Sequence, residues 1–206
     1  MSNNVQDVTC IVLANEFTYL TLPDRFYSSS ADSSVLEYML DSIWTVFDKI
    51  FVVSSIDPPL EIVERTNSVG ARIIMVKPSV SAEALKSSIE NVSTPVTFVI
   101  SGDRPLIKPN VLFSIGYGIK DFDCLIPKWS NGQYDVFLAA YRTDKLKDFL
   151  YSQDGLSKFE QIPNLLENVS FVSVEGDLKL LDPELHSFIR IRDAKDIEKI
   201  IKVIKD

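Results

Sequence analysis

Short runs of β-branched and other apolar residues alternate along the chain with segments of helical periodicity. Four such runs in the first half have the length of strands: 8–13, 49–53, 72–76 and 96–100. Continuous apolar runs of this kind are typical of parallel strands that are buried on both faces. Between them, apolar residues at helical spacing predict helices over 35–47, 60–68 and 81–91, with Ser33 or Ser34 as the first N-cap. This order predicts right-handed βαβ units in an open α/β sheet.

The second half of the chain has a more mixed pattern. We expect a helix over 109–120, strands over 124–127 and 134–141, short helices over 145–151 and 158–167, and a strand over 170–174. Asp193 is expected to cap a last helix. The apolar side of that helix is Ile197, Ile200, Ile201 and Ile204, and its solvent side is Lys195, Lys199, Lys202 and Lys205. Without a repeat or a linker, residues 1–206 are predicted to form a single three-layer α/β/α domain with a Rossmann-like, mostly parallel sheet.

The balance of charge limits the partners of the chain. Acidic residues outnumber basic ones by 29 to 21, which gives a formal net charge of −8 at pH 7. A field of this sign repels nucleic acids and anionic membranes, so we expect neither as a partner. The polar start does not resemble a signal peptide, and no apolar run reaches the roughly 20 residues that a bilayer needs. The expected location is the cytoplasm.

Cysteine and histidine are scarce, which excludes several kinds of chemistry. Cys10 and Cys124 lie in apolar runs and are expected in the core. Together with the single histidine, His186, they fall short of the four ligands of a structural zinc site. His186 alone does not support a Ser-His triad and is expected at the surface or in a helix cap.

The loop that follows the first strand is the most informative part of the sequence. Ligands of open α/β sheets bind beyond the carboxyl ends of the strands, and a phosphate-binding loop there uses glycines and cations. The first glycine of this chain is Gly70, and Arg25 is the only Lys or Arg between Met1 and Trp44. A Walker loop and a dinucleotide-binding fingerprint are therefore both excluded in the first βα unit.

Five segments nevertheless follow one another in the order and register of a known family. They are 13–25, 33–37, 101–106, 126–142 and 181–197. Together they resemble the molybdenum cofactor guanylyltransferases and related nucleotidyltransferases over nearly the whole chain. The resemblance implies a mixed, mostly parallel sheet of the nucleotide-diphospho-sugar transferase type.

The resemblance also implies an activity and its catalytic residues. Family members transfer a nucleotidyl group from a nucleoside triphosphate to a phosphate acceptor, and pyrophosphate leaves. The expected partners are a nucleoside triphosphate, GTP first, and a phosphorylated small molecule such as molybdopterin, while homo- or hetero-oligomers stay open. Asp103 stands at the family's metal-binding aspartate and would hold Mg²⁺, with Mn²⁺ as the alternative, because hard cations prefer carboxylate oxygen. Arg25 stands at a lysine that contacts phosphate.

The same register assigns further residues to the two sides of the site. Leu13, Ala14 and Asn15 are expected to bind the nucleotide together with Arg25. Asp135, Arg190 and Arg192 are expected on the substrate side. Because Arg190 and Arg192 are two residues apart, we expect them on one side of a strand, with a salt bridge near Asp193 as the alternative.

The chain departs from the family in the loop that should hold the phosphates. Asn15 and Glu16 replace paired glycines, Leu20 replaces an arginine, and Glu16 adds negative charge. Loss of one preorganised donor commonly costs about 2.7–4 kcal/mol in the transition state. Several losses together would leave little activity unless other cations compensate. The candidates are Arg104, Arg190 and Arg192.

Three interpretations follow. The first is an active guanylyltransferase-like enzyme with an altered phosphate loop. The second is a non-catalytic relative that keeps the fold for binding or for pairing with another subunit. The third keeps the reaction but changes the acceptor, as in the cobinamide-phosphate guanylyltransferases.

Overall fold

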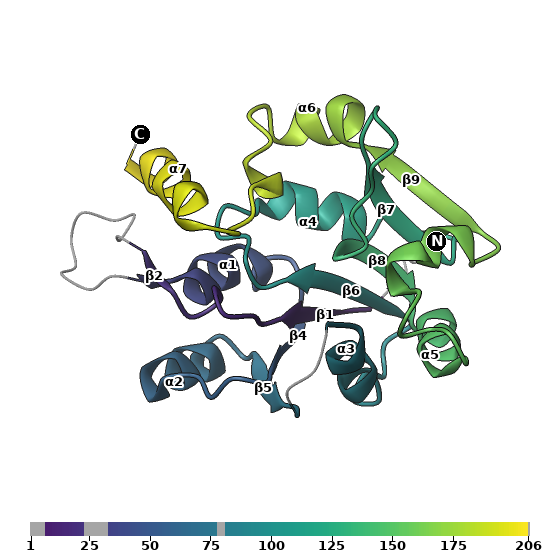
Figure 1. Cartoon of the computed structure of the whole chain (residues 1–206), viewed down its shortest axis with the longest axis horizontal. Coiled ribbons are helices and arrows are strands. Elements are labelled where there is room, and N and C mark those ends of the chain that lie inside the picture. The colour runs from purple at the N-terminus through teal and green to yellow at the C-terminus, as the bar shows by residue number, and fades with distance from the viewer. Residues whose placement is uncertain (1–6, 23–32, 78–80, 206) are drawn as a thin grey trace, which may run out of the picture.

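The computed structural model describes residues 7–22, 33–77 and 81–205, and its centre is a seven-stranded sheet (Figure 1). In chain order the strands of this sheet are β1 (Val8–Leu13), β4 (Lys49–Ser54), β5 (Arg72–Met75), β6 (Val96–Ser101), β7 (Cys124–Lys128), β8 (Leu138–Arg142) and β9 (Val169–Ser173). Their order across the sheet is β5-β4-β1-β6-β8-β7-β9. Only β8 runs against the other strands of this sheet, since it pairs antiparallel with both β6 and β7. The predicted mixed, mostly parallel α/β sheet is confirmed.

Helices cover both faces of the sheet and make three layers. They are α1 (Val35–Ile43), α2 (Leu60–Ser68), α3 (Ser81–Ile89), α4 (Pro109–Gly116), α5 (Thr143–Tyr151) and α7 (Ala194–Lys205). Apolar side chains of α1, α2, α4 and α7 pack in one core, and those of α3 and α5 pack in a second core on the opposite face. Figure 1 shows α3 and α5 together on one side of the sheet, with α1, α4 and α7 on the other.

The alternation along β1 explains why an almost continuous apolar run folds as a central strand. Cys10 and Val12 face one core, while Ile11 and Leu13 face the other, and all four side chains are buried. Successive side chains of a strand point to opposite faces, so both faces must be apolar where helices cover each of them. Both cysteines are buried as expected, and burial raises the pKa of the Cys124 thiol to about 12.

The helix caps follow the predicted chemistry. Ser34 caps α1 through a capping box, in which its hydroxyl accepts from the Glu37 amide and the Glu37 carboxylate accepts from the Ser34 amide. Ser33 and Ser34 also form β3 (Ser33–Ser34), which pairs antiparallel with β2 (Thr21–Leu22). The Asp193 carboxylate accepts from the Lys195 and Asp196 amides and so caps α7.

Three expectations for the second half are wrong in detail. The predicted strand over 134–141 begins only at Leu138, because the Asp135 carboxylate accepts the Phe137 amide and turns the chain. The predicted helix over 158–167 is the 3₁₀ helix η1 (Phe159–Asn164), in which Pro163 has no amide hydrogen to donate. The predicted helix over 109–120 ends at Gly116.

The chain after β9 adds no strand to the sheet. It forms the π-helical turn η2 (Val174–Leu178), the short helix α6 (Lys179–Leu181) and the 3₁₀ turn η3 (His186–Phe188), and it ends in α7. The first two were not expected from the sequence. In the part of the chain that the structure describes, no helix has both the length and the apolar character needed to cross a membrane.

Candidate functional site

The candidate site lies where the carboxyl ends of β1 and β6 meet. These strands pair in parallel with Leu13 opposite Ser101, so the loops that follow them are neighbours. Gly102 makes the approach close, since its amide donates to the Leu13 carbonyl at 2.8 Å. A Cβ at this position would lie 2.9 Å from that carbonyl oxygen and 3.1 Å from the Ala14 Cα. A glycine is therefore required here, and it brings Asn15 within 3.3 Å of Asp103, Nδ2 to Oδ2.

Asp103 is buried at this edge and its carboxylate is held from three sides. The Ser101 hydroxyl donates to Oδ1 at 2.8 Å, and the side-chain amide of Asn15 donates to Oδ2. Arg190 covers the remaining side, with Nε 3.1 Å from both oxygens and Nη2 2.8 Å from Oδ2. Burial alone would lower the pKa of Arg190, but its hydrogen bonds and charge interaction with Asp103 raise it above its ordinary value.

A second ion pair lies beside the first and more deeply in the molecule. The Arg104 side chain is 1% exposed, and its Nη2 pairs with the Asp135 carboxylate. Its other nitrogens donate to the Ser101 hydroxyl at 3.1 Å and the Ser187 carbonyl at 3.4 Å. Burial lowers the pKa of Arg104 although Asp135 opposes the shift, and a guanidinium stays protonated in proteins. The two pairs form a cluster of two arginines and two aspartates at one edge of the sheet.

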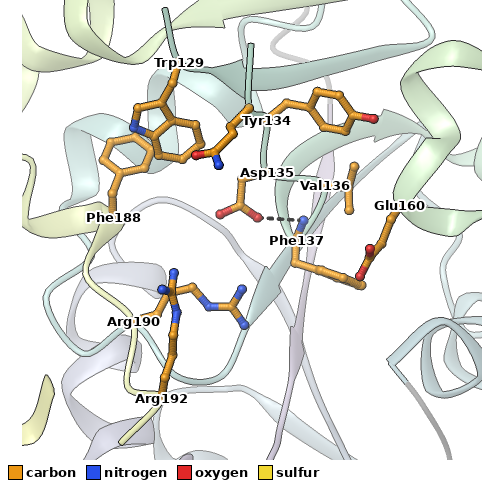
Figure 2. Close-up of a pocket in the computed structure, with 10 residues that line it drawn as sticks. Trp129, Tyr134, Asp135, Val136, Phe137, Glu160, Phe188, Arg190 and Arg192 are labelled. Atoms are coloured by element: carbon orange, nitrogen blue, oxygen red, sulfur yellow. Dashed lines mark hydrogen bonds between the residues drawn. The ribbon is translucent and has the colours of Figure 1, made fainter. Parts of the chain in front are cut away.

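A pocket of about 500 Å³ opens next to this cluster. Its walls are Trp129, Gln133, Tyr134, Asp135, Val136, Phe137, Glu160, Phe188, Arg190 and Arg192. Figure 2 shows Trp129 and Phe188 on one wall, with Arg190 and Arg192 below Asp135. The Trp129 and Phe188 rings meet edge to face at 5.3 Å. Aromatic walls with a few convergent charged groups are typical of a small-molecule site.

The loop after β1 is closed, because four of its backbone amides already donate to acceptors in the loop or in β4. The backbone amide of Asn15 donates to the Thr18 hydroxyl at 2.8 Å, and the side-chain oxygen of Asn15 accepts from the backbone amide of Phe17 at 3.0 Å. The Ala14 amide donates to Val53 and the Thr18 amide to Asn15. Backbone amides that cradle a phosphate must be free to point at it, and these four are already used. The expected role of Ala14 and Asn15 in nucleotide binding stays a prediction.

The segment that carries Arg190 is fastened to the start of α4. Asp182 is fully buried and lies 2.7 Å from the Lys108 ammonium and 2.7 Å from the Ser187 amide. The Ser187 hydroxyl in turn accepts from the Lys108 amide at 3.1 Å. Burial raises the pKa of Asp182, but the hydrogen bonds and charge of Lys108 and Ser187 lower it by more, so the net shift of the pKa is downward. This anchor fixes the direction from which Arg190 reaches Asp103.

We expect Asp182→Asn to be about 1–3 kcal/mol less stable than the wild type at pH 7. A lowered carboxyl pKa contributes stability above the unfolded value, near 3.8, and that contribution is lost as the pH falls through the folded pKa. The gap in urea midpoint between the two proteins should therefore shrink below about pH 4. Asp154→Asn, which breaks an exposed pair with Lys158, is the control. A gap at Asp182 that does not change with pH would contradict the assignment.

Known proteins with similar sequence share one name. A probable molybdenum cofactor guanylyltransferase of Methanosarcina mazei is 26% identical over 128 residues, which are 62% of this chain and 54% of that protein. Another, of Natranaerobius thermophilus, is 24% identical over 204 residues, or 96% of this chain and 97% of that protein. The chain thus matches only about half the length of the first relative. No protein-family model matches it.

Solved structures give the same answer for the fold. Molybdopterin-guanine dinucleotide biosynthesis protein A of Archaeoglobus fulgidus has a TM-score of 0.68 and 21% identity, over 95% of this chain and 98% of its own. The chain is similar in sequence to proteins named as probable molybdenum cofactor guanylyltransferases. The 2-C-methyl-D-erythritol 4-phosphate cytidylyltransferase of Thermus thermophilus has a TM-score of 0.65 at 14% identity, over 96% of this chain and 98% of its own. The guanylyltransferase-like chain thus has the nucleotide-diphospho-sugar transferase fold that its sequence predicts.

The structure brings most of the predicted site residues together. Asp103, Asp135 and Arg190 meet within the cluster, and Arg192 lies on the rim of the same pocket. Leu13 ends β1 with a buried side chain, so only its carbonyl takes part, by accepting from Gly102. Arg25 lies outside the described residues, and its predicted contact with phosphate is untested.

The structure contradicts three interpretations of the arginines of this guanylyltransferase-like chain. Arg190 and Arg192 do not belong to a strand: between η3 and α7 the chain forms no strand, and the Ile191 amide donates to the Asp103 carbonyl at 3.0 Å. Arg190 also does not pair near Asp193 but with Asp103, 87 positions away. Arg104, one of three candidate cations for the phosphates, is instead buried against Asp135.

The aromatic wall was missed as a functional feature. Trp129 and Phe188 lie in two segments that resemble the family, yet neither was assigned to the site. A tryptophan just after β7 and an aromatic residue just before Arg190 are the signal that could have found the pocket, since both lie at the carboxyl edge.

The residues of the cluster do not fit the divalent cation that the guanylyltransferases imply. Among residues 7–22, 33–77 and 81–205, no group of three or more His, Cys, Asp or Glu side chains is placed to hold a metal ion. Both oxygens of Asp103 already accept from Arg190. A metal ion at Asp103 would also lie beside the positive guanidinium of Arg190. Two unit charges of like sign 4 Å apart repel by about 4 kcal/mol near a protein surface, and the charge of a divalent ion would double this repulsion. The expectation of Mg²⁺ on Asp103 stays untested, and the donor set disfavours it.

Proposed function

We propose that this chain is a nucleotidyltransferase of the guanylyltransferase kind. It binds GTP at the carboxyl edge of the sheet, beside Asp103, and a phosphorylated acceptor of the molybdopterin class in the adjoining pocket. One observation carries the proposal: residues far apart in the sequence converge on this edge and join a pocket with aromatic walls to two arginines. The names of the curated relatives favour molybdopterin over cobinamide phosphate as the source of the acceptor phosphate.

The reaction joins the two phosphates next to the arginines. An oxygen of the acceptor phosphate attacks the α-phosphorus of GTP, the bond from that phosphorus to the bridging oxygen breaks, and pyrophosphate leaves with the electron pair. Arg192 and the free side of Arg190 line the pocket and would neutralise the charge that develops on the phosphates. The flat walls of Trp129 and Phe188 would orient the ring system of the acceptor.

The closed β1 loop supports a second candidate, a binding subunit that does not catalyse transfer. Four of its backbone amides already donate to protein acceptors, and Glu16 is exposed there. Both features disfavour the binding of a triphosphate in this loop. This candidate predicts ligand binding in the pocket without release of pyrophosphate.

A thermal unfolding assay with GTP, ATP, CTP and UTP tests binding, in Mg²⁺ and again in EDTA. Ligand at 100 times its dissociation constant stabilises by about 2.7 kcal/mol, and about 2–4 °C per kcal/mol for this size gives a shift of roughly 5–11 °C. We expect a shift with GTP that falls in Arg192→Ala and persists in Arg142→Ala, whose arginine is remote from the pocket.

Pyrophosphate release then separates the two candidates. GTP binding with acceptor-dependent release supports the enzyme, and GTP binding without release supports the binding subunit. A chain that binds none of the four nucleotides in either buffer would overturn the proposed function.

A further inference from the structure

We propose that Arg190 takes the place of a divalent cation at Asp103, so that this chain binds the phosphates of its ligand without a metal ion. The inference rests on the proposed function for the identity of the ligand, a nucleoside triphosphate. It concerns how the site supplies positive charge, which separates this chain from an enzyme that uses Mg²⁺ at the same aspartate.

The contacts of Asp103 fill the positions that a metal ion would need. Oδ1 accepts from the Ser101 hydroxyl at 2.8 Å and from Arg190 Nε at 3.1 Å. Oδ2 accepts from Arg190 Nε and Nη2 at 3.1 and 2.8 Å and from Asn15 at 3.3 Å. A carboxylate offers about four acceptor sites on two oxygens. Four donor groups, of which Arg190 Nε is shared between both oxygens, therefore match the four acceptor sites, and the Asp103 side chain is only 4% exposed.

The neighbouring carboxylate is also committed. Asp135 pairs with the buried guanidinium of Arg104 and accepts the Phe137 amide on its other oxygen at 3.1 Å. A hard cation in a protein is usually held by more than one oxygen ligand. The two aspartates of the cluster are thus each matched by an arginine, and the cluster is neutral without any ion.

Arg190 keeps donors for a ligand after it has paired with Asp103. Its guanidinium has five N–H donors in a planar fork, and Nη1 makes no hydrogen bond to any residue that the structure describes. The side chain is 30% exposed and lines the pocket. A guanidinium held by a carboxylate on one edge presents its other edge to phosphate oxygens in a fixed orientation. Arg190 can therefore bridge the aspartate and the phosphate, as a metal ion does in other enzymes.

The first arm of the test measures metal binding by the intact chain without nucleotide. Titration of Mn²⁺, followed through the EPR signal of the free ion, compares the wild type with Arg190→Asn. Removal of the guanidinium frees the Asp103 carboxylate, so the variant should bind Mn²⁺ at least about tenfold more tightly than the wild type. Arg192→Asn is the matched control, because it removes the same charge from the pocket rim without releasing a carboxylate. Arg190→Gln is a second variant should the asparagine fail to fold.

The second arm measures GTP binding by thermal shift in EDTA and in Mg²⁺. The wild-type shift should be the same in both buffers, whereas that of Arg190→Asn should appear only with Mg²⁺. Equal Mn²⁺ affinity in the wild type and both Arg190 variants would overturn the proposal, as would a wild-type shift abolished by EDTA. If GTP shifts the wild type in neither buffer, the proposed function fails, and the Mn²⁺ titration still decides this inference.

Discussion

Replacement of Arg104 with methionine is expected to lower the free energy of unfolding by about 3–5 kcal/mol. The Arg104 guanidinium is buried against Asp135, whose side chain is only 13% exposed. Methionine fills a similar volume but leaves the carboxylate without its ionic partner and the Ser187 carbonyl without its donor. An uncompensated charge in such surroundings costs more than the pair contributed.

Urea unfolding curves would measure this effect. Arg142→Met removes a partly exposed arginine, 3.9 Å from Asp144, and should cost less than about 1 kcal/mol. The double variant Arg104→Met/Asp135→Asn should recover part of the loss, because the unpaired charge is then absent. A loss at Arg104 as small as that at Arg142 would show that the buried pair is not a stabilising centre of the site.

The double variant Asn15→Gly/Glu16→Gly is expected to bind GTP more tightly than the wild type. Removal of the Asn15 side chain releases the Phe17 amide, which can then donate to a phosphate, and removal of Glu16 takes a negative charge from the loop. A hydrogen bond to a charged group contributes about 1.5–3 kcal/mol, or roughly 10- to 150-fold in affinity.

Isothermal titration calorimetry with GTP would compare the double variant with the wild type. Glu167→Gly is the control for charge, since it removes an exposed acid just before β9, at the amino end of the sheet and away from the site. It should leave the affinity unchanged. If the double variant binds no better than the wild type, the closed loop is not what limits nucleotide binding.

The sequence predicts the parallel half of the fold well because each element there carries its own signal. The run from Val8 to Leu13 is apolar on both faces, and α2 has the bounds that its periodicity predicts. Elements held by side chains or by distant contacts are harder to predict. The turn before β8 depends on Asp135, whose position is set by its ion pair with Arg104. The pattern of hydrophobic residues along the chain does not predict that ion pair.

The site was predicted as a set of residues but not as an arrangement. Family register selects Asp103 and Arg190, and the structure does bring them together. Register says nothing about whether the two form an ion pair or bind separate ligands, because that depends on the path of the chain between Asp182 and Arg190. That path is fixed by Lys108 and Ser187, through contacts that span more than seventy positions.

All seven strands of the main sheet are complete at Ser173, yet Phe188, Arg190 and Arg192 come after it. Part of the pocket wall thus comes from a segment that adds no strand to the main sheet. Substitutions at Phe188, Arg190 and Arg192 can exchange the cation and one aromatic wall without changing strand pairing, whereas Val174, Leu178, Ile191 and Ile200 of the same segment belong to the core. Evolution and protein engineering can therefore change the ligand of this fold at these three positions while the buried residues around them keep the segment in place.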